Sequence, residues 1–220
     1  MTLLRHDPDF PSLDEQALAA WAEVPPAIAS DCMNRSRTMA AAIKPLAPGV
    51  RLLGQARTVA CMVGDNSAVH AALRLIRPGE VLVIAAGGHR DTALWGGLLT
   101  RAAIARGAAG VVIDGAVRDV AEIRGIGFPC FAAAAVPAGP HKGFGGVLDG
   151  VIACAGCTVA PGDLVLGDDD GVAVVPLARA DAVLAACRAR LAHEAEALER
   201  LEAGTLLADQ MGIAEPDRAD

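Results

Sequence analysis

Residues 81–119 read VLVIAAGGHRDTALWGGLLTRAAIARGAAGVVIDGAVRD. The stretch contains two apolar runs, 81–85 and 110–114, of the continuous kind that buried parallel strands form. Between them, residues 97–106 have the composition of a helix, and Gly107 is placed to end it. Strand, helix and strand in this order predict a right-handed βαβ unit and therefore the α/β fold class.

Further elements are expected on both sides of this unit. The expected helices are one from the capping box at 12–15 to Pro25-Pro26, one over 27–39, one over 64–76, a short one after Asp119 and a long one over 178–203. The expected strands lie at 50–63 (interrupted near Gly54), 128–131, 151–157, 164–166 and 172–175. Residues 136–150 are rich in glycine and proline, which predicts a loop.

Composition limits the class of protein. Hydrophobic residues make up 53% of 220, enough for a sizeable core. The 26 acidic and 19 basic residues give a net charge of −7, which argues against nucleic-acid binding but allows a small acidic substrate. The chain lacks an apolar run long enough to span a membrane, and its start lacks a signal peptide's apolar core. We therefore expect a cytoplasmic protein with no membrane partner and with reduced cysteines.

The loop after the second predicted strand carries Arg118-Asp119-x-x-Glu122. Since ligands bind at the carboxyl ends of parallel strands, this loop should lie beside the turn Gly96-Gly97 that follows the first strand. Free N–H groups at the helix start that follows suit a carboxylate, and Arg118 suits a carboxylate or keto oxygen. Asp119 can bind Mg²⁺ or Mn²⁺, which prefer oxygen ligands. The pattern indicates a metal-held, negatively charged ligand.

Each of these residues also has a structural interpretation. Asp119-x-x-Glu122 has the form of a helix capping box, and Glu122 can either cap or hold metal-bound water. Asn66 can orient a substrate that His70 supports, or it can cap a helix beside a partly exposed histidine. Arg90-Asp91 has no glutamate behind it, which favours a solvated loop.

Three other patterns favour structure over chemistry. Cys154-Ala-Gly-Cys157 lacks the second pair that a zinc site needs, so we expect buried thiols. The acidic stretch 168–171 lacks the ligand spacing of a calcium loop and predicts a hairpin turn. Neither Lys44 nor Lys142 lies in the apolar strand context of a Schiff-base lysine. A metal is therefore the expected electron sink for aldolase or decarboxylase chemistry.

At Gly97-x20-Arg118-Asp119-x-x-Glu122 the chain resembles the RraA-like family, which includes the 4-hydroxy-4-methyl-2-oxoglutarate/4-carboxy-4-hydroxy-2-oxoadipate aldolases. Smaller matching pieces lie at 30–31, 43–46, 64–66, 139–142, 161–163 and 170–172. The resemblance covers about Ala27 to Gly204. It implies a single domain over residues 1–220, built as an α/β/β sandwich with a long C-terminal helix. It also implies homotrimers or hexamers with active sites at the clefts between subunits.

The resemblance also implies roles for individual residues. Asp119 would bind the divalent metal, Arg118 the keto acid, and the backbone of Gly96, Gly97, Leu98 and Leu99 the substrate carboxylate. Asn66 matches a substrate-side asparagine.

Two positions are less straightforward. Glu194 matches a glutamate that reaches the neighbouring subunit's metal through water, with Glu196 and Glu199 as close competitors. Aldolases of the family carry aspartate where this chain has Gly97, which counts against aldol cleavage of the largest substrates.

Together these features predict a metal-dependent (class II) lyase for a small 2-oxo acid substrate. We expect retro-aldol cleavage of 4-hydroxy-2-oxo acids to pyruvate, and oxaloacetate decarboxylation through the same pyruvate enolate. One alternative is a non-catalytic regulator that binds the endonuclease RNase E, and another is a lyase for a different 2-oxo acid. The intact Arg-Asp-x-x-Glu motif favours an enzyme, because a pure binder needs no metal site.

Overall fold

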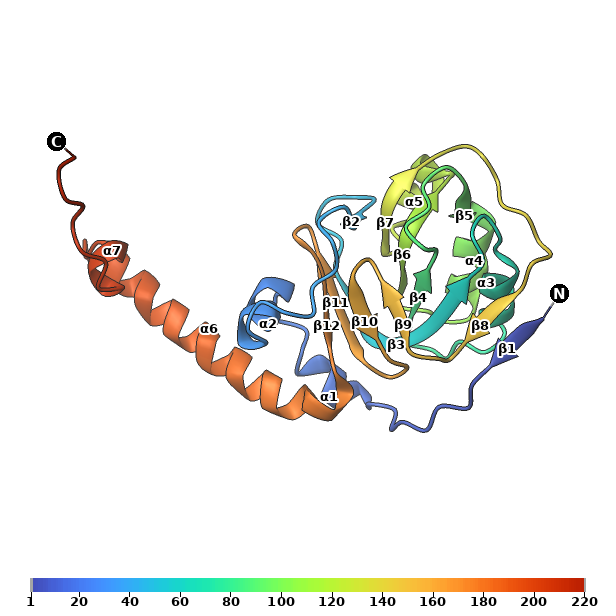
Figure 1. The fold of residues 1–220 in the computed structure, drawn as a ribbon. Coiled ribbons are helices and arrows are strands. Elements are labelled where there is room, and N and C mark those ends of the chain that lie inside the picture. The colour runs from blue at the N-terminus through green and yellow to red at the C-terminus, as the bar shows by residue number, and fades with distance from the viewer. Residues whose placement is uncertain (1, 220) are drawn as a thin grey trace.

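The computed structural model describes residues 2–219. Four adjacent parallel strands form its centre: β3 (Leu52–Cys61), β4 (Glu80–Ala85), β6 (Gly110–Val117) and β7 (Cys130–Ala135). Helix α4 (Gly97–Ala105) connects β4 to β6, and these two strands pair in parallel, which confirms the βαβ unit. Three helices pack on one face of this sheet (Figure 1): α3 (Ser67–Ala72), α4 and α5 (Val120–Ile126).

A second β layer covers the other face of the sheet. Its strands are β9 (Ile152–Cys154), β10 (Cys157–Val159), β11 (Leu164–Asp168) and β12 (Gly171–Val175). Short strands extend or flank the main sheet: β1 (Leu3–Arg5), β2 (Lys44–Pro45), β5 (Ala93–Trp95) and β8 (Gly146–Leu148). Beyond the second layer lie α1 (Glu15–Ala19), α2 (Pro26–Cys32) and α6 (Ala180–Glu202) (Figure 1). The architecture confirms the predicted α/β/β arrangement.

The apolar runs are continuous because both faces of the central strands are buried. Along β6, Val111 and Ile113 point into the core under the helices, whereas Val112 points into the core between the β layers. Successive side chains of a strand alternate between faces, so a strand buried on both sides needs an apolar residue at every position.

Helix α6 extends away from the body of the molecule, and α7 (Leu207–Gln210) packs near its end (Figure 1). The buried residues of α6 are Ala180, Val183 and Cys187, all in the first half of that helix. Within residues 2–219, no helix has the length and apolar content that crossing a membrane requires.

Several expected boundaries were wrong for local reasons. Helix α2 ends at Cys32 and not at Met39, because Asn34 and Arg35 adopt left-handed backbone angles that stop a helix. The cap of α1 is Asp14, whose side chain accepts the N–H of Ala17.

The strand expected to break near Gly54 is the unbroken β3. Gly54 is needed there because a side chain would collide with the carbonyl oxygen of Gly79. Strand β8 lies in the segment 136–150 that was expected as a loop, and β5 lies between the expected strand at 81–85 and the expected helix at 97–106, where no strand was expected.

Other expectations about turns and cysteines are confirmed. Asp168 to Gly171 connects β11 to β12 as a hairpin. Cys154 and Cys157 face each other across the β9–β10 hairpin as buried free thiols. Burial raises the pKa of both thiols, which keeps them protonated and unreactive.

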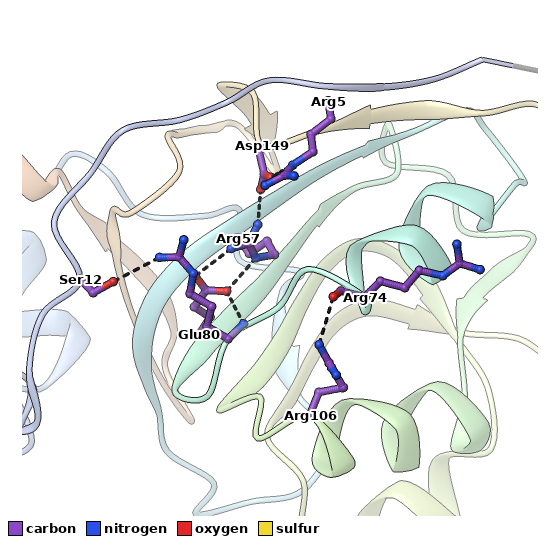
Figure 2. A network of polar contacts seen from close by, with 8 residues as sticks. Arg5, Ser12, Arg57, Arg74, Glu80, Arg106 and Asp149 are labelled. Carbon is purple, nitrogen blue, oxygen red and sulfur yellow. Dashed lines mark hydrogen bonds and ion pairs between the residues drawn. The ribbon is translucent and has the colours of Figure 1, made fainter.

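A buried network of charges lies toward the amino end of β4 (Figure 2). Arg57 donates to both oxygens of Glu80 at 2.7 and 3.0 Å, and to Asp149 at 2.7 Å. These three residues are at most 5% exposed. From β1, Arg5 donates to the second oxygen of Asp149 at 3.0 Å, which ties the N-terminal strand to the sheet.

Candidate active site

Arg118 and Asp119 follow β6 directly, at the carboxyl end of the parallel strands. They line a cavity of about 160 Å³. The turn into α4 contributes Gly96, Leu98 and Leu99 to its wall, and residues from two further segments complete it: Asn66, His70, Pro140 and Lys142. The prediction that the loops after β4 and β6 lie together is confirmed. Because the cavity is small and polar on several sides, it suits a small acid.

Asp119 does not act as the capping residue that its spacing to Glu122 predicted. Its backbone is left-handed, with φ 58° and ψ 35°, and among residues 2–219 its side chain caps no N–H of α5. Instead Oδ2 accepts the N–H of Gly97 at 3.0 Å and lies 3.7 Å from Nε of Arg118. A non-glycine residue rarely adopts this conformation, and such residues cluster at functional sites. The backbone thus turns the carboxylate toward α4.

Gly96 allows this close approach. A Cβ atom at Gly96 would lie 2.6 Å from Oδ2 of Asp119 and 3.1 Å from Cγ of Arg118. Two hydrogen bonds fix the turn, since Trp95 Nε1 donates to Thr100 Oγ1 at 2.8 Å, and that hydroxyl donates to the carbonyl of Gly96 at 3.1 Å. The first-turn N–H groups of α4 are therefore held in place, and the helix dipole makes this end of the helix favourable for a negatively charged group.

Arg118 is held by its backbone and leaves its guanidinium open. Its N–H donates to the carbonyl of Trp95 at 3.0 Å, and its side chain is 44% exposed. The guanidinium passes close to Gly139, where a Cβ atom would lie 2.6 Å from Nη1. The fork of donors can therefore reach a carboxylate or ketone in the cavity.

Asn66 is in the wall of the cavity and is 4% exposed. It occupies the N-cap position of α3, but its Nδ2 donates to the carbonyl of Leu94 at 3.0 Å, so the side-chain capping interpretation was wrong. His70, one turn later, is exposed and also lines the cavity. Partial burial of the ring and the charge of Lys142 lower the pKa of His70, which favours its neutral form.

Sequence reasoning missed Asp65 and the role of the loop that carries Lys142. Asp65 is fully buried, and its Oδ2 accepts the N–H groups of Gly143 at 2.6 Å and Phe144 at 3.1 Å. Burial alone would raise the pKa of Asp65, but hydrogen bonds from Ser67 and from this loop outweigh it and lower the pKa. Asp65 thereby fixes the loop against α3, close to the cavity. Its position after Gly64, in a turn before a helix, was the available signal.

Comparisons with known proteins identify the family of this chain. A family model described as RraA-like, Aldolase/RraA, matches residues 26–174. This chain belongs to the RraA-like family. It is 35% identical to a Halalkalibacterium halodurans protein provisionally named 4-hydroxy-4-methyl-2-oxoglutarate aldolase, over 84% of this chain and 88% of that one.

A second relative has the same enzyme name, whereas a similar crystal structure has a different one. A Thermus thermophilus protein named 4-hydroxy-4-methyl-2-oxoglutarate aldolase is 35% identical, over 67% of this chain and 89% of that one. The crystal structure of Streptomyces coelicolor RraAS2, described as an unusual member of the RNase ES inhibitor RraA protein family, matches with a TM-score of 0.76 and 29% identity, over 86% of this chain and 98% of that one. The RraA-like family therefore includes proteins named as enzymes and proteins named as inhibitors.

In this RraA-like chain, Glu122 occupies the space beside Gly97. Its Oε1 accepts from Nε of Arg101 at 2.9 Å, and its Oε2 lies close to the position that a Cβ atom at Gly97 would take. An aspartate at position 97, as in the family's aldolases, would require this flexible side chain to move. Glu122 is thus a second acidic group next to the start of α4, but unlike Asp119 it lies outside the wall of the cavity.

Glu194 lies on α6, where its carboxylate accepts from Arg190 at 2.9 Å. It is outside the cavity wall of its own chain, and its role toward a neighbouring subunit stays a prediction. Arg90 and Asp91 are exposed and also lie outside the cavity wall, as the solvated-loop interpretation expects.

The single carboxylate of Asp119 is compatible with a hard divalent cation that keeps most of its waters. Within residues 2–219, no group of three or more His, Cys, Asp or Glu side chains could hold a metal ion. Mg²⁺ is commonly bound by one or two carboxylates, with substrate oxygens and water completing the shell. Asp119, 42% exposed at the cavity, offers that kind of partial site.

Proposed function

We propose that this protein is a divalent-metal-dependent lyase that cleaves 4-hydroxy-2-oxo acids of the 4-hydroxy-4-methyl-2-oxoglutarate type to pyruvate. The observation that carries the proposal is the left-handed Asp119, whose carboxylate is held beside Arg118 and the first turn of α4. The names of the Thermus and Halalkalibacterium relatives support the same substrate class. We further propose oxaloacetate decarboxylation at this site and assembly as a homotrimer or hexamer.

Different residues of the cavity bind different parts of the substrate. The substrate carboxylate meets the N–H groups at the start of α4, which are oriented before binding. The guanidinium of Arg118 faces the ketone oxygen, where negative charge develops as the bond between C3 and C4 breaks. The electron pair of that bond passes into the pyruvate enolate, while the C4 hydroxyl loses its proton and C4 becomes a carbonyl. Protonation at C3 then gives pyruvate.

A divalent cation bound by Asp119 would supply Lewis-acid stabilisation of negative charge on the substrate. Gly97 orients Asp119 for this role, because the N–H of Gly97 donates to Oδ2 while the side chain of Asp119 stays 42% exposed. Decarboxylation of oxaloacetate yields the same enolate when carbon dioxide leaves, so the same donors serve both reactions.

The test is pyruvate release from 4-hydroxy-4-methyl-2-oxoglutarate and from oxaloacetate, with Mg²⁺, with Mn²⁺ and with EDTA. Asp119→Ala should lower turnover of both substrates by at least about a hundredfold, as loss of a transition-state contact does. Asp91→Ala is the matched control, since Asp91 is exposed and outside the cavity wall. Metal-independent turnover, or equal activity of the two variants, would contradict the proposal.

The name of RraAS2 gives a second candidate, inhibition of an RNase E-type endonuclease by direct binding. In that case the cavity would be irrelevant, and Asp119→Ala would inhibit RNA cleavage as well as the unmodified protein does. Such inhibition, together with a failure to release pyruvate under any metal condition, would favour this second function.

A further inference from the structure

The cavity beside Arg118 contains an acceptor that the chain leaves unused, the side-chain oxygen of Asn66. This residue is 4% exposed, and its Oδ1 atom has no hydrogen-bond partner among residues 2–219. Buried polar atoms in native proteins are nearly always paired, so an unpaired one indicates a partner that comes from outside the chain. Because Asn66 lies in the cavity wall, that partner is expected to be the ligand.

The orientation of the amide is fixed, which decides what the ligand must offer. Nδ2 of Asn66 donates to the carbonyl of Leu94 at 3.0 Å, so the amide cannot turn over and present its NH₂ group instead. The backbone of Asn66 is anchored as well, since its N–H donates to the carbonyl of His141 at 3.1 Å. Oδ1 therefore accepts hydrogen bonds and needs a donor.

Most other polar groups of the cavity have the opposite preference. Arg118, Lys142 and the N–H groups at the start of α4 are donors, and they suit carboxylates and ketones. The other acceptor, the carboxylate of Asp119, already accepts the N–H of Gly97. At neutral pH a simple 2-oxo acid such as oxaloacetate in its keto form carries acceptors alone. It can satisfy those donors, but it has nothing to donate to Asn66. A hydroxyl group on the same carbon chain supplies the missing donor.

We propose that Oδ1 of Asn66 accepts a hydrogen bond from the C4 hydroxyl of the substrate, so that the cavity selects hydroxylated 2-oxo acids over those without this group. The inference rests on the proposed function and names the residue that sets its specificity. In the retro-aldol step the proton of this hydroxyl leaves for water as the C4 carbonyl forms. Asn66 is neutral, so it orients the O–H bond without taking the proton.

The first test uses two unreactive ligands, 2,4-dihydroxybutyrate and 2-hydroxybutyrate, which differ by the C4 hydroxyl and lack the ketone. Each has a carboxylate at one end only, so 2-hydroxybutyrate cannot bind in reverse and place its hydroxyl at C4. Calorimetry with the full chain and Mg²⁺ should show that the dihydroxy acid binds about 5- to 100-fold more tightly, as a buried hydrogen bond predicts. Asn66→Leu should bind both acids equally, and Asn66→Asp, which keeps an oxygen there, should retain the preference. Equal binding by the unmodified protein, or an unchanged preference in Asn66→Leu, would overturn the proposal.

The second test separates the two reactions. Asn66→Leu should lower kcat/KM for 4-hydroxy-4-methyl-2-oxoglutarate by about 10- to 100-fold, and for oxaloacetate by no more than about threefold. Equal losses for both substrates would mean that Asn66 has a general structural role, which contradicts the proposal. If the unmodified protein releases no pyruvate but still prefers the dihydroxy acid, then the lyase function fails and the recognition of the hydroxyl stands.

Discussion

Two arginine–carboxylate groups lie toward opposite ends of the parallel strands, and the chain satisfies them to very different degrees. Toward the amino end of β4, Arg57 is 4% exposed and donates to both Glu80 and Asp149 (Figure 2). At the carboxyl end of β6, the side chain of Arg118 is 44% exposed, with the carboxylate of Asp119 at 3.7 Å. The first group, Arg57 with Glu80 and Asp149, has its hydrogen bonds satisfied within the protein, and we call it the closed group. The second, Arg118 with Asp119, keeps hydrogen-bonding capacity available for a ligand, and we call it the open group.

The burial of a charged pair indicates whether the pair serves stability or function. Both groups lie at the same sheet, and both contain an arginine and a carboxylate. A buried pair that loses one partner leaves an uncompensated charge, so its removal should affect folding. An exposed pair contributes little to stability, so its removal should affect binding and turnover. The predictions below test that separation.

The largest effect is expected from Arg57→Ala. The substitution leaves the carboxylate of Glu80 buried without an arginine and that of Asp149 with Arg5 alone, which should lower the free energy of unfolding by about 3–5 kcal/mol. Urea unfolding followed by circular dichroism measures this value. Molecules that remain folded should keep the kcat/KM of the unmodified protein, since the network lies away from the cavity wall.

Arg118→Ala is the matched control and should give the reverse result. We expect a change in unfolding free energy of about 1 kcal/mol or less. In contrast, kcat/KM should fall by about 10²- to 10³-fold, as when a donor to a developing oxyanion is lost. A strongly destabilised Arg118→Ala, or an Arg57→Ala protein of normal stability, would remove the distinction between the two groups.

The second prediction concerns the contact between Gly96 and Asp119 in the open group. Gly96→Ala places a Cβ atom 2.6 Å from Oδ2 of Asp119, which must then move. Since φ at Gly96 is −169°, alanine is tolerated by the backbone, and stability should change little. A displacement of about 1 Å at a reacting group can lower the rate by about 10²-fold, so we expect a loss of that size in kcat/KM.

Gly97→Ala is the control for this change. Its Cβ atom meets the end of the flexible side chain of Glu122, which can rotate away. We therefore expect kcat/KM within about threefold of the unmodified protein, because Glu122 lies outside the cavity wall. If Gly97→Ala is as inactive as Gly96→Ala, then Glu122 belongs to the reaction, and the metal-site role expected from the sequence gains support.

The sequence predicted the open group well because its parts follow strands. Continuous apolar runs placed β4 and β6, and the rule that ligands bind beyond the carboxyl ends of parallel strands placed Arg118 beside the turn at Gly96. What it missed was the conformation of Asp119. A capping box and a left-handed residue that reaches across to α4 share the same Asp-x-x-Glu spacing, and long-range packing decides between them.

The closed group was not predictable in the same way. Arg57, Glu80 and Asp149 are distant in sequence, and pairing of β3 with β4 and β8 brings them together. The same limit explains β5 and β8, which are short strands in segments rich in turn residues and exist because neighbouring strands offer hydrogen bonds. Local patterns predict where a strand is buried, but not which distant side chains meet.

The smallest of the expected effects concerns Asp65, which combines features of both groups because it is buried but supports the cavity. In Asp65→Asn, an NH₂ group replaces one oxygen and faces N–H donors, so the free energy of unfolding should fall by about 1–3 kcal/mol at pH 7. The loop that carries Lys142 should loosen as well, which weakens substrate binding and raises KM.

The pH dependence of this loss follows from the lowered pKa of Asp65 in the folded protein. A carboxylate of this kind stabilises the fold above its unfolded pKa of about 3.9, and the contribution disappears as pH falls through the folded pKa. The difference between Asp65→Asn and the unmodified protein should therefore be full at pH 7 and shrink below about pH 4. Urea unfolding of both proteins over this range measures it. A difference that stays constant down to acid pH would mean that the hydrogen-bond geometry at Asp65, and not its charge, holds the loop in place.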